Sequence, residues 1–182
     1  MSLKHAILGF LDMTPLSGYD LKKMFDASVN FYWPATHSQI YRTLNRMLED
    51  ELVTQEIVHQ EDYPDKKVYH VTDEGRRKLR DWLVTPAEEL PTVRHRLLVQ
   101  LAWADRLENE EIITLLEAYA DKLRSRLELY HSQDQRSQLD YARTERERYL
   151  WQVILDNGIG TYECELEWAE GAIAGLRDFA ER

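Results

Sequence analysis

The stretch HSQIYRTLNRMLEDELV, residues 37–53, combines the apolar spacing of a packed helix with an opposite side of unusual composition. At about 100° per residue, four apolar side chains fall in one arc of about 100°, the width of a stripe that faces a core. These four are Ile40, Leu44, Met47 and Leu48. The other side lacks the usual mixture of Glu and Lys. It holds Glu49 at its C-terminal end and six further residues, here called the polar face: Ser38, Gln39, Tyr41, Arg42, Asn45 and Arg46.

Capping signals predict where this helix and the one before it begin. Ser17 stands three residues before Asp20 in SGYDLKKMF, a capping-box arrangement that starts a helix. Pro34 prevents that helix from continuing, because proline lacks an amide donor. Thr36, followed three residues later by Gln39, then begins the helix of residues 37–50.

The remaining segments before residue 85 complete a recognisable order of elements. Residues 3–12 form a short apolar helix pattern, and residues 52–58 and 68–71 are β-branched runs joined by a polar loop. A further helix follows at residues 73–83. The order helix, helix, helix, strand, strand, helix predicts a mainly α protein that begins with a winged helix-turn-helix domain and a two-stranded wing.

Charge and proline content predict a division of the chain near residue 85. The first domain is expected at residues 1–85, a linker with two prolines at 86–92, and an all-α domain at 93–182. Residues 1–85 hold 11 Lys and Arg against 13 Asp and Glu, whereas residues 86–182 hold 12 against 20. The second domain therefore carries net charge -8 of the total of -10.

The second domain is expected to be helical throughout. Asn109 is expected to cap a helix with a heptad-like seam of apolar residues, which one chain or two chains could fill. An Asp156-Asn157-Gly158 turn is expected to end the following helix, and a last helix to begin at Thr161. The seam consists of Ile112, Leu116, Tyr119, Leu123, Leu127 and Tyr130.

Composition and motifs argue against several classes of protein. A net charge of -10 is unsuited to coating nucleic acid over the whole surface, and no apolar run reaches the roughly 18 residues of a membrane span. The one cysteine, Cys164, excludes an internal disulfide, and a cytoplasmic location is expected. The sequence holds no phosphate-binding loop, nucleophile elbow or zinc-binding motif. We therefore expect no enzyme activity, no metal and no cofactor.

The polar face is the main functional signal. The major groove of DNA admits one helix, and Arg, Asn, Gln, Ser and Tyr are side chains that contact bases and phosphates there. Lys66 and Lys67, at the end of the hairpin loop, would meet phosphates from a wing. A merely solvated helix face and a solvated turn are the alternatives for each feature alone. Their combination in this order favours binding of double-stranded DNA.

The same segments resemble the PadR-type winged helix family of transcription regulators. The motifs AILGFL, SGYDL, FYWPATHSQIYRTLNRMLEDELV and KVYHVTDEGRRKLRDWL follow one another with compatible spacing between residues 6 and 83. The acidic helical region after them is similar to the family's C-terminal dimerisation domain, including the longer type of virulence-gene activators. Two positions depart from the common pattern. Arg42 stands where many members have proline, and Glu51 stands where many have glycine, which puts the tight turn into the first strand in doubt.

The resemblance implies a cytoplasmic homodimer that binds a pseudo-palindromic operator, with its third helix in the major groove. It assigns subunit pairing to the C-terminal helices. A repressor released by a small hydrophobic or phenolic effector is expected, and Trp33, Trp103, Trp151 and Trp168 could line such a site or form plain core. The residues expected to pair the subunits are Leu116, Tyr119, Leu123, Leu127, Leu166, Ile173 and Leu176.

Two other functions stay open from the sequence. An activator with the same fold differs in the sign of its effect on transcription. A helical protein-interaction adaptor would use the acidic surface and bind no DNA.

Overall fold

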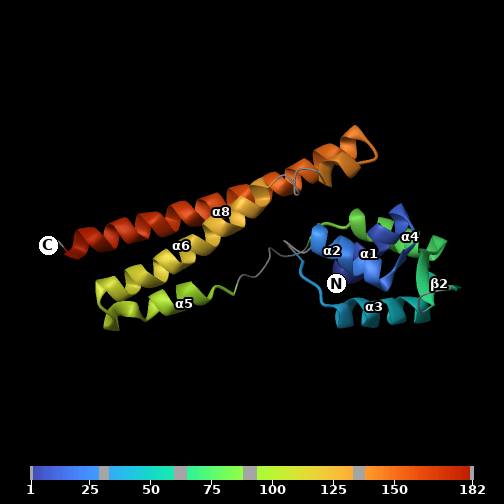
Figure 1. The fold of residues 1–182 in the computed structure, drawn as a ribbon, viewed down its shortest axis with the longest axis horizontal. Coiled ribbons are helices and arrows are strands. Elements are labelled where there is room, and N and C mark those ends of the chain that lie inside the picture. Colours follow the sequence, from blue (N-terminus) through green and yellow to red (C-terminus); the bar gives the residue numbers. More distant parts are fainter. Residues whose placement is uncertain (1, 29–32, 60–64, 88–93, 133–137, 181–182) are drawn as a thin grey trace. The chain divides into compact units, whose positions relative to one another are not determined.

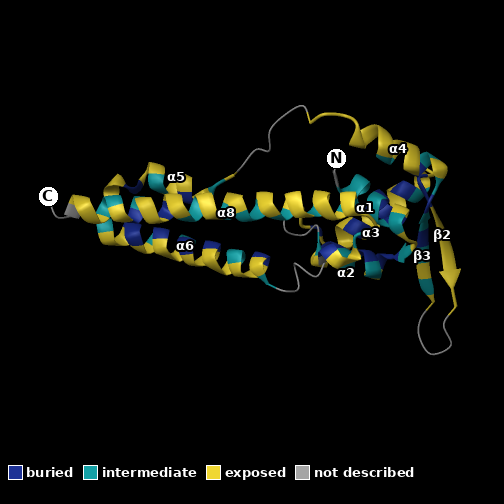
Figure 2. Cartoon of the chain, turned by 90° about the horizontal axis from the view of Figure 1, so that it is seen from above, coloured by how far each residue is buried: buried dark blue, intermediate teal, exposed yellow. Residues whose placement is uncertain are grey.

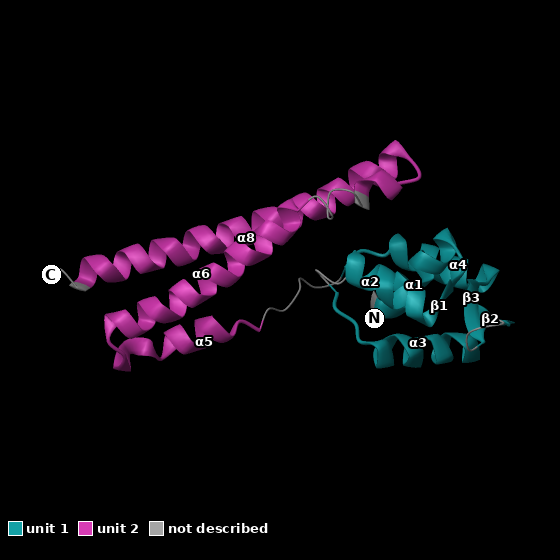
Figure 3. Ribbon diagram, in the orientation of Figure 1, with its two compact units in different colours: residues 1–90 teal, residues 91–182 magenta. Residues whose placement is uncertain are grey.

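The computed structural model describes residues 2–28, 33–59, 65–87, 94–132 and 138–180 of the chain. The chain forms two compact units, Met1–Leu90 and Pro91–Arg182, which are coloured separately in Figure 3. Much of the expected linker, residues 88–92, lies outside the described part.

The described part of unit 1 contains four helices and a small sheet (Figure 1). Each of the last three helices begins with a side-chain cap: Ser17 accepts the amide of Asp20, Thr36 that of Gln39, and Thr72 that of Gly75. At the start of α3 both bonds of the expected capping box are present. At the start of α2, Ser17 caps the helix as expected, and its hydroxyl donates to Asp20 Oδ2. The helices are α1 (Ser2–Met13), α2 (Gly18–Ala27), α3 (His37–Glu49) and α4 (Asp73–Leu83).

The sheet has three antiparallel strands in the order β1-β3-β2. The hairpin of β2 (Val53–Val58) and β3 (Lys66–Val71) is the expected wing, with Val53 opposite Val71 and Val58 opposite Lys66. A third strand, β1 (Leu16–Ser17), pairs with β3 and was not predicted. Two residues are too few to show an alternating pattern, so periodicity could not reveal β1.

The core of unit 1 lies between the helices and the inner face of the sheet. Ile40, Leu44 and Met47 are fully buried, so the apolar stripe predicted for α3 is confirmed, although Leu48 is only half-buried. Burying aliphatic side chains of this size stabilises a fold by about 1.5–3 kcal/mol each. These three residues therefore fix which side of α3 faces outwards. They pack with Ile7, Leu8, Leu11, Leu21, Phe25, Ala35, Leu52, Val53, Tyr69 and Val71.

A tight turn joins α3 to β2 in spite of Glu51. The amide of Glu51 donates to the Leu48 carbonyl at 3.1 Å, and the amide of Leu52 donates to the Met47 carbonyl at 2.9 Å, which together form a Schellman motif. Glu51 has φ 56°, the only positive φ among the described residues other than glycine. The turn that the sequence put in doubt therefore forms, and a residue with a Cβ atom occupies its left-handed position.

The start of α4 approaches this turn very closely. The Thr72 hydroxyl donates to the Glu51 carbonyl at 2.8 Å, and its amide donates to the Leu52 carbonyl at 3.1 Å. A Cβ atom on Gly75 would stand 2.2 Å from the Leu52 carbonyl oxygen and 2.8 Å from Val71 Cγ2. Only glycine leaves room for this contact.

All the secondary structure elements described in unit 2 are helices. Two long helices, α6 (Asn109–His131) and α8 (Glu145–Ala180), run side by side (Figure 1). The shorter elements are α5 (Arg96–Ala102), η2 (Ala104–Arg106) and η3 (Gln138–Tyr141). Figure 2 shows the buried residues of α6 on the side that faces α8.

Three boundaries predicted in unit 2 are wrong. Residues 156–158 do not form a turn, and no helix begins at Thr161, because α8 continues from Glu145 to Ala180 without interruption. Gly158 packs against the ring of Tyr130 so closely that a Cβ atom there would stand 2.7 Å from Tyr130 Cε1. Tertiary packing therefore outweighs the roughly 1 kcal/mol by which glycine disfavours a helix interior.

The third incorrect boundary is the cap of α6. Glu108 precedes the first helical residue, and its amide donates to the Glu111 carboxylate at 3.0 Å. Asn109 does not cap the helix. Its side-chain amide donates instead to the Leu176 carbonyl at 3.2 Å, which ties the start of α6 to the end of α8.

We expect Gly75→Ala to lower the free energy of unfolding by about 1–3 kcal/mol, since the added methyl group overlaps the Leu52 carbonyl. Urea denaturation followed by circular dichroism measures the change. Gly9→Ala is the matched control, because nothing lies within 4 Å of a Cβ atom at Gly9. A Gly75→Ala variant as stable as the wild type would contradict the close approach.

We expect Glu51→Gly to raise the free energy of unfolding by about 1 kcal/mol, because glycine adopts positive φ without the steric cost of a Cβ atom. The same urea titration detects this as a higher midpoint with an unchanged slope. Asp50→Gly is the control, since Asp50 has φ -80° and gains nothing from glycine. A lower midpoint for Glu51→Gly would show that Glu51 makes a compensating contact.

Candidate nucleic-acid interface

The polar face of α3 is exposed along its whole length. Ile40, Leu44 and Met47 hold the opposite side of the helix in the core, so the six polar residues point away from it. All six members are exposed: Ser38, Gln39, Tyr41, Arg42, Asn45 and Arg46. A helix that projects one polar side from a compact domain has the shape that a major groove accepts.

The polar face is cationic although the protein is acidic. Residues 37–48 contain two arginines and no carboxylate. No ion pair joins Arg42 or Arg46 to another residue that the structure describes. Both guanidinium groups are therefore available to phosphates or to base edges, and neither must first break an internal pair.

Gln39 differs from the other members of the polar face, because it also belongs to the helix cap. Its Oε1 atom accepts hydrogen bonds from the backbone amide of Thr36 at 2.8 Å and from the Thr36 hydroxyl at 3.1 Å. The side-chain NH₂ group remains for an external partner. Bidentate reading of adenine requires both ends of the amide, so Gln39 cannot read a base in that way while it caps the helix.

Tyr41 is partly packed against unit 1. Its side chain is 42% exposed, and its ring lies over Gly18, the first residue of α2. Tyr69 lies nearby in β3. Burial raises the pKa of the Tyr69 phenol, and the Tyr41 phenol raises it further. Tyr41 thus contacts α2 and also faces outwards.

The two wing lysines have different partners. Lys66 Nζ lies 2.8 Å from Asp20 Oδ2, so the loop end of the hairpin is joined to the first turn of α2. Lys67 is exposed, and within the described ranges it forms no ion pair. The sequence analysis assigned both lysines the same role. It could not predict the contact between Lys66 and Asp20, because these residues are 46 positions apart in the chain. Lys67 is the freer cation for a phosphate.

Asp20 connects three elements. Its carboxylate accepts the Ser17 hydroxyl at 2.7 Å and pairs with Lys66, and its amide donates to Ser17 Oγ at 3.1 Å. The hydrogen bond from Lys66 holds the pKa of Asp20 below the ordinary value of an aspartate, against the opposing effect of burial. This network fixes the start of α2 to β1 and β3.

The residues expected to pair the subunits pack largely within one chain. Leu116, Leu123 and Ile173 are buried in unit 2, where α6 meets α8. The heptad-like seam is thus filled by the chain's own α8, which answers the question that the sequence left open. The other four expected residues, Tyr119, Leu127, Leu166 and Leu176, are half-buried.

Tyr119 belongs to a hydrogen-bonded cluster that ties α5 to α6 and α8. His95 Nδ1 accepts the Leu98 amide at 3.3 Å, so its Nε2 donates to the Tyr119 hydroxyl at 2.8 Å. That hydroxyl donates in turn to Glu165 Oε2 at 2.8 Å. Burial, followed by the Glu165 contact, raises the pKa of Tyr119 to about 12. Trp168 packs edge-on against both rings, and its role here is structural.

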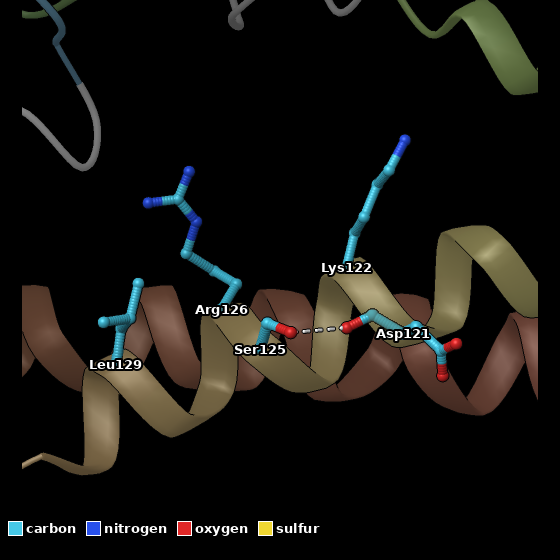
Figure 4. Close-up of a pocket in the computed structure, with 5 residues that line it drawn as sticks. All are labelled: Asp121, Lys122, Ser125, Arg126 and Leu129. Atoms are coloured by element: carbon cyan, nitrogen blue, oxygen red, sulfur yellow. Dashed lines mark hydrogen bonds between the residues drawn. The ribbon is translucent and has the colours of Figure 1, made fainter.

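The structure offers little support for an effector pocket made of tryptophans. The described part of α6 has a shallow surface depression lined by Asp121, Lys122, Ser125, Arg126 and Leu129, all on one side of the helix (Figure 4). None of the four tryptophans proposed as lining residues contributes to this depression. Trp103 is 74% exposed and Trp33 is 41% exposed.

Among the described residues, no group of His, Cys, Asp or Glu could hold a metal ion. None of the described helices is both long and apolar enough to span a membrane.

A winged helix domain with an exposed cationic helix, followed by a helical unit, defines the class of DNA-binding transcriptional regulators. Residues 7–81 match the "Transcriptional regulator PadR-like family", and residues 93–177 match "Virulence activator alpha C-term". Over 188 residues the chain is 31% identical to a probable transcriptional regulator of Mycobacterium tuberculosis, covering 98% of this chain and 99% of that protein. The chain therefore belongs to the PadR-like family of transcriptional regulators.

Other relatives agree in sequence and in structure. The negative transcriptional regulator PadR of Bacillus subtilis is 32% identical over 125 residues, or 69% of each chain. The crystal structure of that PadR with operator DNA has a TM-score of 0.84 at 26% identity, covering 97% of this chain and 99% of that one. Its complex with p-coumaric acid has a TM-score of 0.78 at 25% identity, with 96% and 95% covered. The Vibrio cholerae virulence activator AphA has a TM-score of 0.74 at 29% identity, with 98% and 99% covered.

We expect Asp20→Asn to lower the free energy of unfolding at pH 7 by about 0.5 kcal/mol, since the pair with Lys66 is partly exposed. The folded-state pKa of Asp20 lies below 3.8, so this stabilisation is present above pH 3.8 and is lost as the pH falls through the folded-state pKa. Urea titrations between pH 7 and pH 3 should therefore show the two proteins converging.

The control for this experiment is Asp81→Asn, because Asp81 is exposed and forms no ion pair with another described residue. A stability difference for Asp20→Asn that stays constant down to the lowest pH would contradict the ion-pair explanation.

Proposed function

We propose that this transcriptional regulator is a homodimeric repressor that binds a pseudo-palindromic operator with α3 of each subunit in the major groove. The observation that carries this proposal is the polar face of α3, whose arginines are exposed and without carboxylate partners among the described residues. Two such helices related by a two-fold axis would meet half-sites about 34–36 Å, or a multiple of this spacing, apart.

The exposed side chains suggest a division of roles within the interface. Arg42 and Asn45, which lie within one turn of each other, are suited to base edges in the groove. Arg46 and Ser38 are suited to phosphates on either side, and Gln39 to a single hydrogen bond because of its place in the cap. Lys67 is suited to a phosphate contact from the wing.

An apolar strip on α8 supports the homodimer. Tyr130, one residue before the end of α6, already contacts Gly158, so the part of α8 before residue 158 extends beyond the α6 partner (Figure 1). That part carries four large apolar side chains that are between 46% and 67% exposed, namely Tyr149, Leu150, Val153 and Ile154. A strip of this kind is typical of an interface. We assign it to subunit pairing, while Leu116, Tyr119, Leu123, Leu127, Leu166, Ile173 and Leu176 hold the α6–α8 pair that presents it.

The relatives support the sign of regulation and the kind of effector. The Bacillus subtilis protein is named a negative regulator, which favours a repressor. The AphA protein is named a virulence activator, so an activator of the same fold is the alternative function. The solved complex of PadR with p-coumaric acid favours a small phenolic acid as the effector. We place the protein in the cytoplasm, where it would meet chromosomal DNA, and propose no enzymatic role.

Electrophoretic mobility shift with DNA from upstream of the protein's own gene tests the proposal. A specific complex that survives competitor DNA, weakens with salt and is released by p-coumaric acid is the expected result. Transcription of the adjacent gene should rise when the regulator is deleted. A fall would identify an activator, and failure to form any specific complex would favour a protein-interaction adaptor.

We expect Arg42→Ala to weaken operator binding by about 1–3 kcal/mol and to relax specificity at one base position. Lys67→Ala should weaken binding to all sequences alike and reduce the salt slope by about one. Fluorescence anisotropy at several salt concentrations measures both effects. Lys122→Ala, which removes one positive charge from unit 2, is the control. Unchanged affinity in both interface variants would overturn the groove assignment.

A further inference from the structure

Gly18 lies beneath Tyr41, and only its lack of a side chain allows the two residues to sit together. A Cβ atom on Gly18 would stand 2.5 Å from Tyr41 Cε1, 2.6 Å from Cζ and 2.9 Å from the hydroxyl oxygen. Ordinary van der Waals contact begins at about 3.4 Å, so a methyl group cannot be added unless the ring moves. The contact joins the first residue of α2 to the outward face of α3.

Backbone conformation does not explain the glycine. No described glycine has a positive φ, so an alanine could adopt the backbone of Gly18 without strain. Gly18 is also the first residue of α2, where alanine is at least as favourable as glycine. The requirement at this position is therefore space for the ring of Tyr41.

The backbone at Gly18 is held on both sides and cannot retreat from the ring. Leu16 and Ser17 pair with Tyr69 and Val68 of β3, and Ser17 caps α2. On the other side, Asp20 is joined to Lys66. Any added atom at Gly18 must therefore displace Tyr41 and not the turn.

The ring of Tyr41 is packed on one side and exposed on the other. It covers Gly18 at the first turn of α2 while 42% of its surface stays exposed. Packing of one side fixes the direction of the exposed edge before DNA arrives, which reduces the entropy lost on binding.

We propose that Gly18 is a positioning residue for operator recognition, which acts by setting the orientation of Tyr41 on the face of α3 that meets DNA. This inference rests on the proposed DNA-binding function. Gly18 touches no base. It determines where the Tyr41 ring and hydroxyl stand relative to Arg42 and Asn45, and a displaced ring would obstruct the approach of the groove or lose its contact.

A double-mutant cycle with the full-length protein tests this role. Operator affinity is measured by fluorescence anisotropy for the wild type, Gly18→Ala, Tyr41→Ala and the double variant, with the upstream DNA fragment and a scrambled fragment as probes. Gly18→Ala alone should weaken specific binding on the order of tenfold and leave binding to the scrambled fragment nearly unchanged. In the Tyr41→Ala background the same methyl group should change specific binding by less than about twofold, since the space has been vacated.

Gly9→Ala controls for the general effect of replacing a helical glycine, because a Cβ atom there meets nothing within 4 Å. Urea denaturation of each variant separates loss of affinity from loss of folding. If Gly18→Ala fails to fold, the double variant should still fold and should bind like Tyr41→Ala. A double variant that also fails to fold would overturn the proposal.

The outcomes separate this inference from the function on which it rests. If the wild type forms no specific complex, the proposed function fails and the positioning role fails with it. If the wild type binds specifically and Gly18→Ala costs the same factor in both backgrounds, or nothing in either, only the positioning role is overturned.

Discussion

Burial of Ile40, Leu44 and Met47 is the constraint on which the rest of unit 1 depends. These three side chains are inaccessible to solvent, so rotating α3 about its axis would expose them, at a cost of several kcal/mol. The exposed direction of the polar face is therefore a consequence of packing and needs no DNA to form. The Schellman turn at Glu51 and the Gly75 contact then fix where the wing begins relative to α3.

The acidity of the chain and its role in DNA binding are compatible because charge is distributed unevenly. Residues 37–48 carry two arginines and no carboxylate within a chain that has 33 Asp and Glu residues against 23 Lys and Arg. At physiological ionic strength the Debye length is about 8 Å, so distant carboxylates are largely screened at the groove, and the nearest ones, Glu49, Asp50 and Glu51, follow the arginines at the C-terminal end of α3. The same acidity discourages binding over the rest of the surface, which favours specific over non-specific complexes.

Local sequence patterns predicted what depends on neighbours in the chain and missed what depends on distant partners. The caps at Ser17 and Thr36 and the stripe of α3 follow from spacings of three and four residues, and the structure confirms them. The prediction of a turn at Asp156-Asn157-Gly158 was wrong because Gly158 lies inside α8, where it packs against the ring of Tyr130 from α6. Of the candidate interface, the polar face could be deduced from one helix, whereas the different surroundings of Lys66 and Lys67 could not.

The pair between Lys66 and Asp20 changes how salt dependence relates to the number of contacts. A lysine that already has a carboxylate partner exchanges one anion for another when it meets a phosphate, so it contributes less to the net attraction than a lysine that was paired only with water. The carboxylate of Asp20 in α2 and the operator would then compete for the same ammonium group. The dependence of the operator-binding constant on salt concentration reports the net number of phosphate charges that the protein neutralises. It would therefore understate how many cations of this protein touch the DNA backbone.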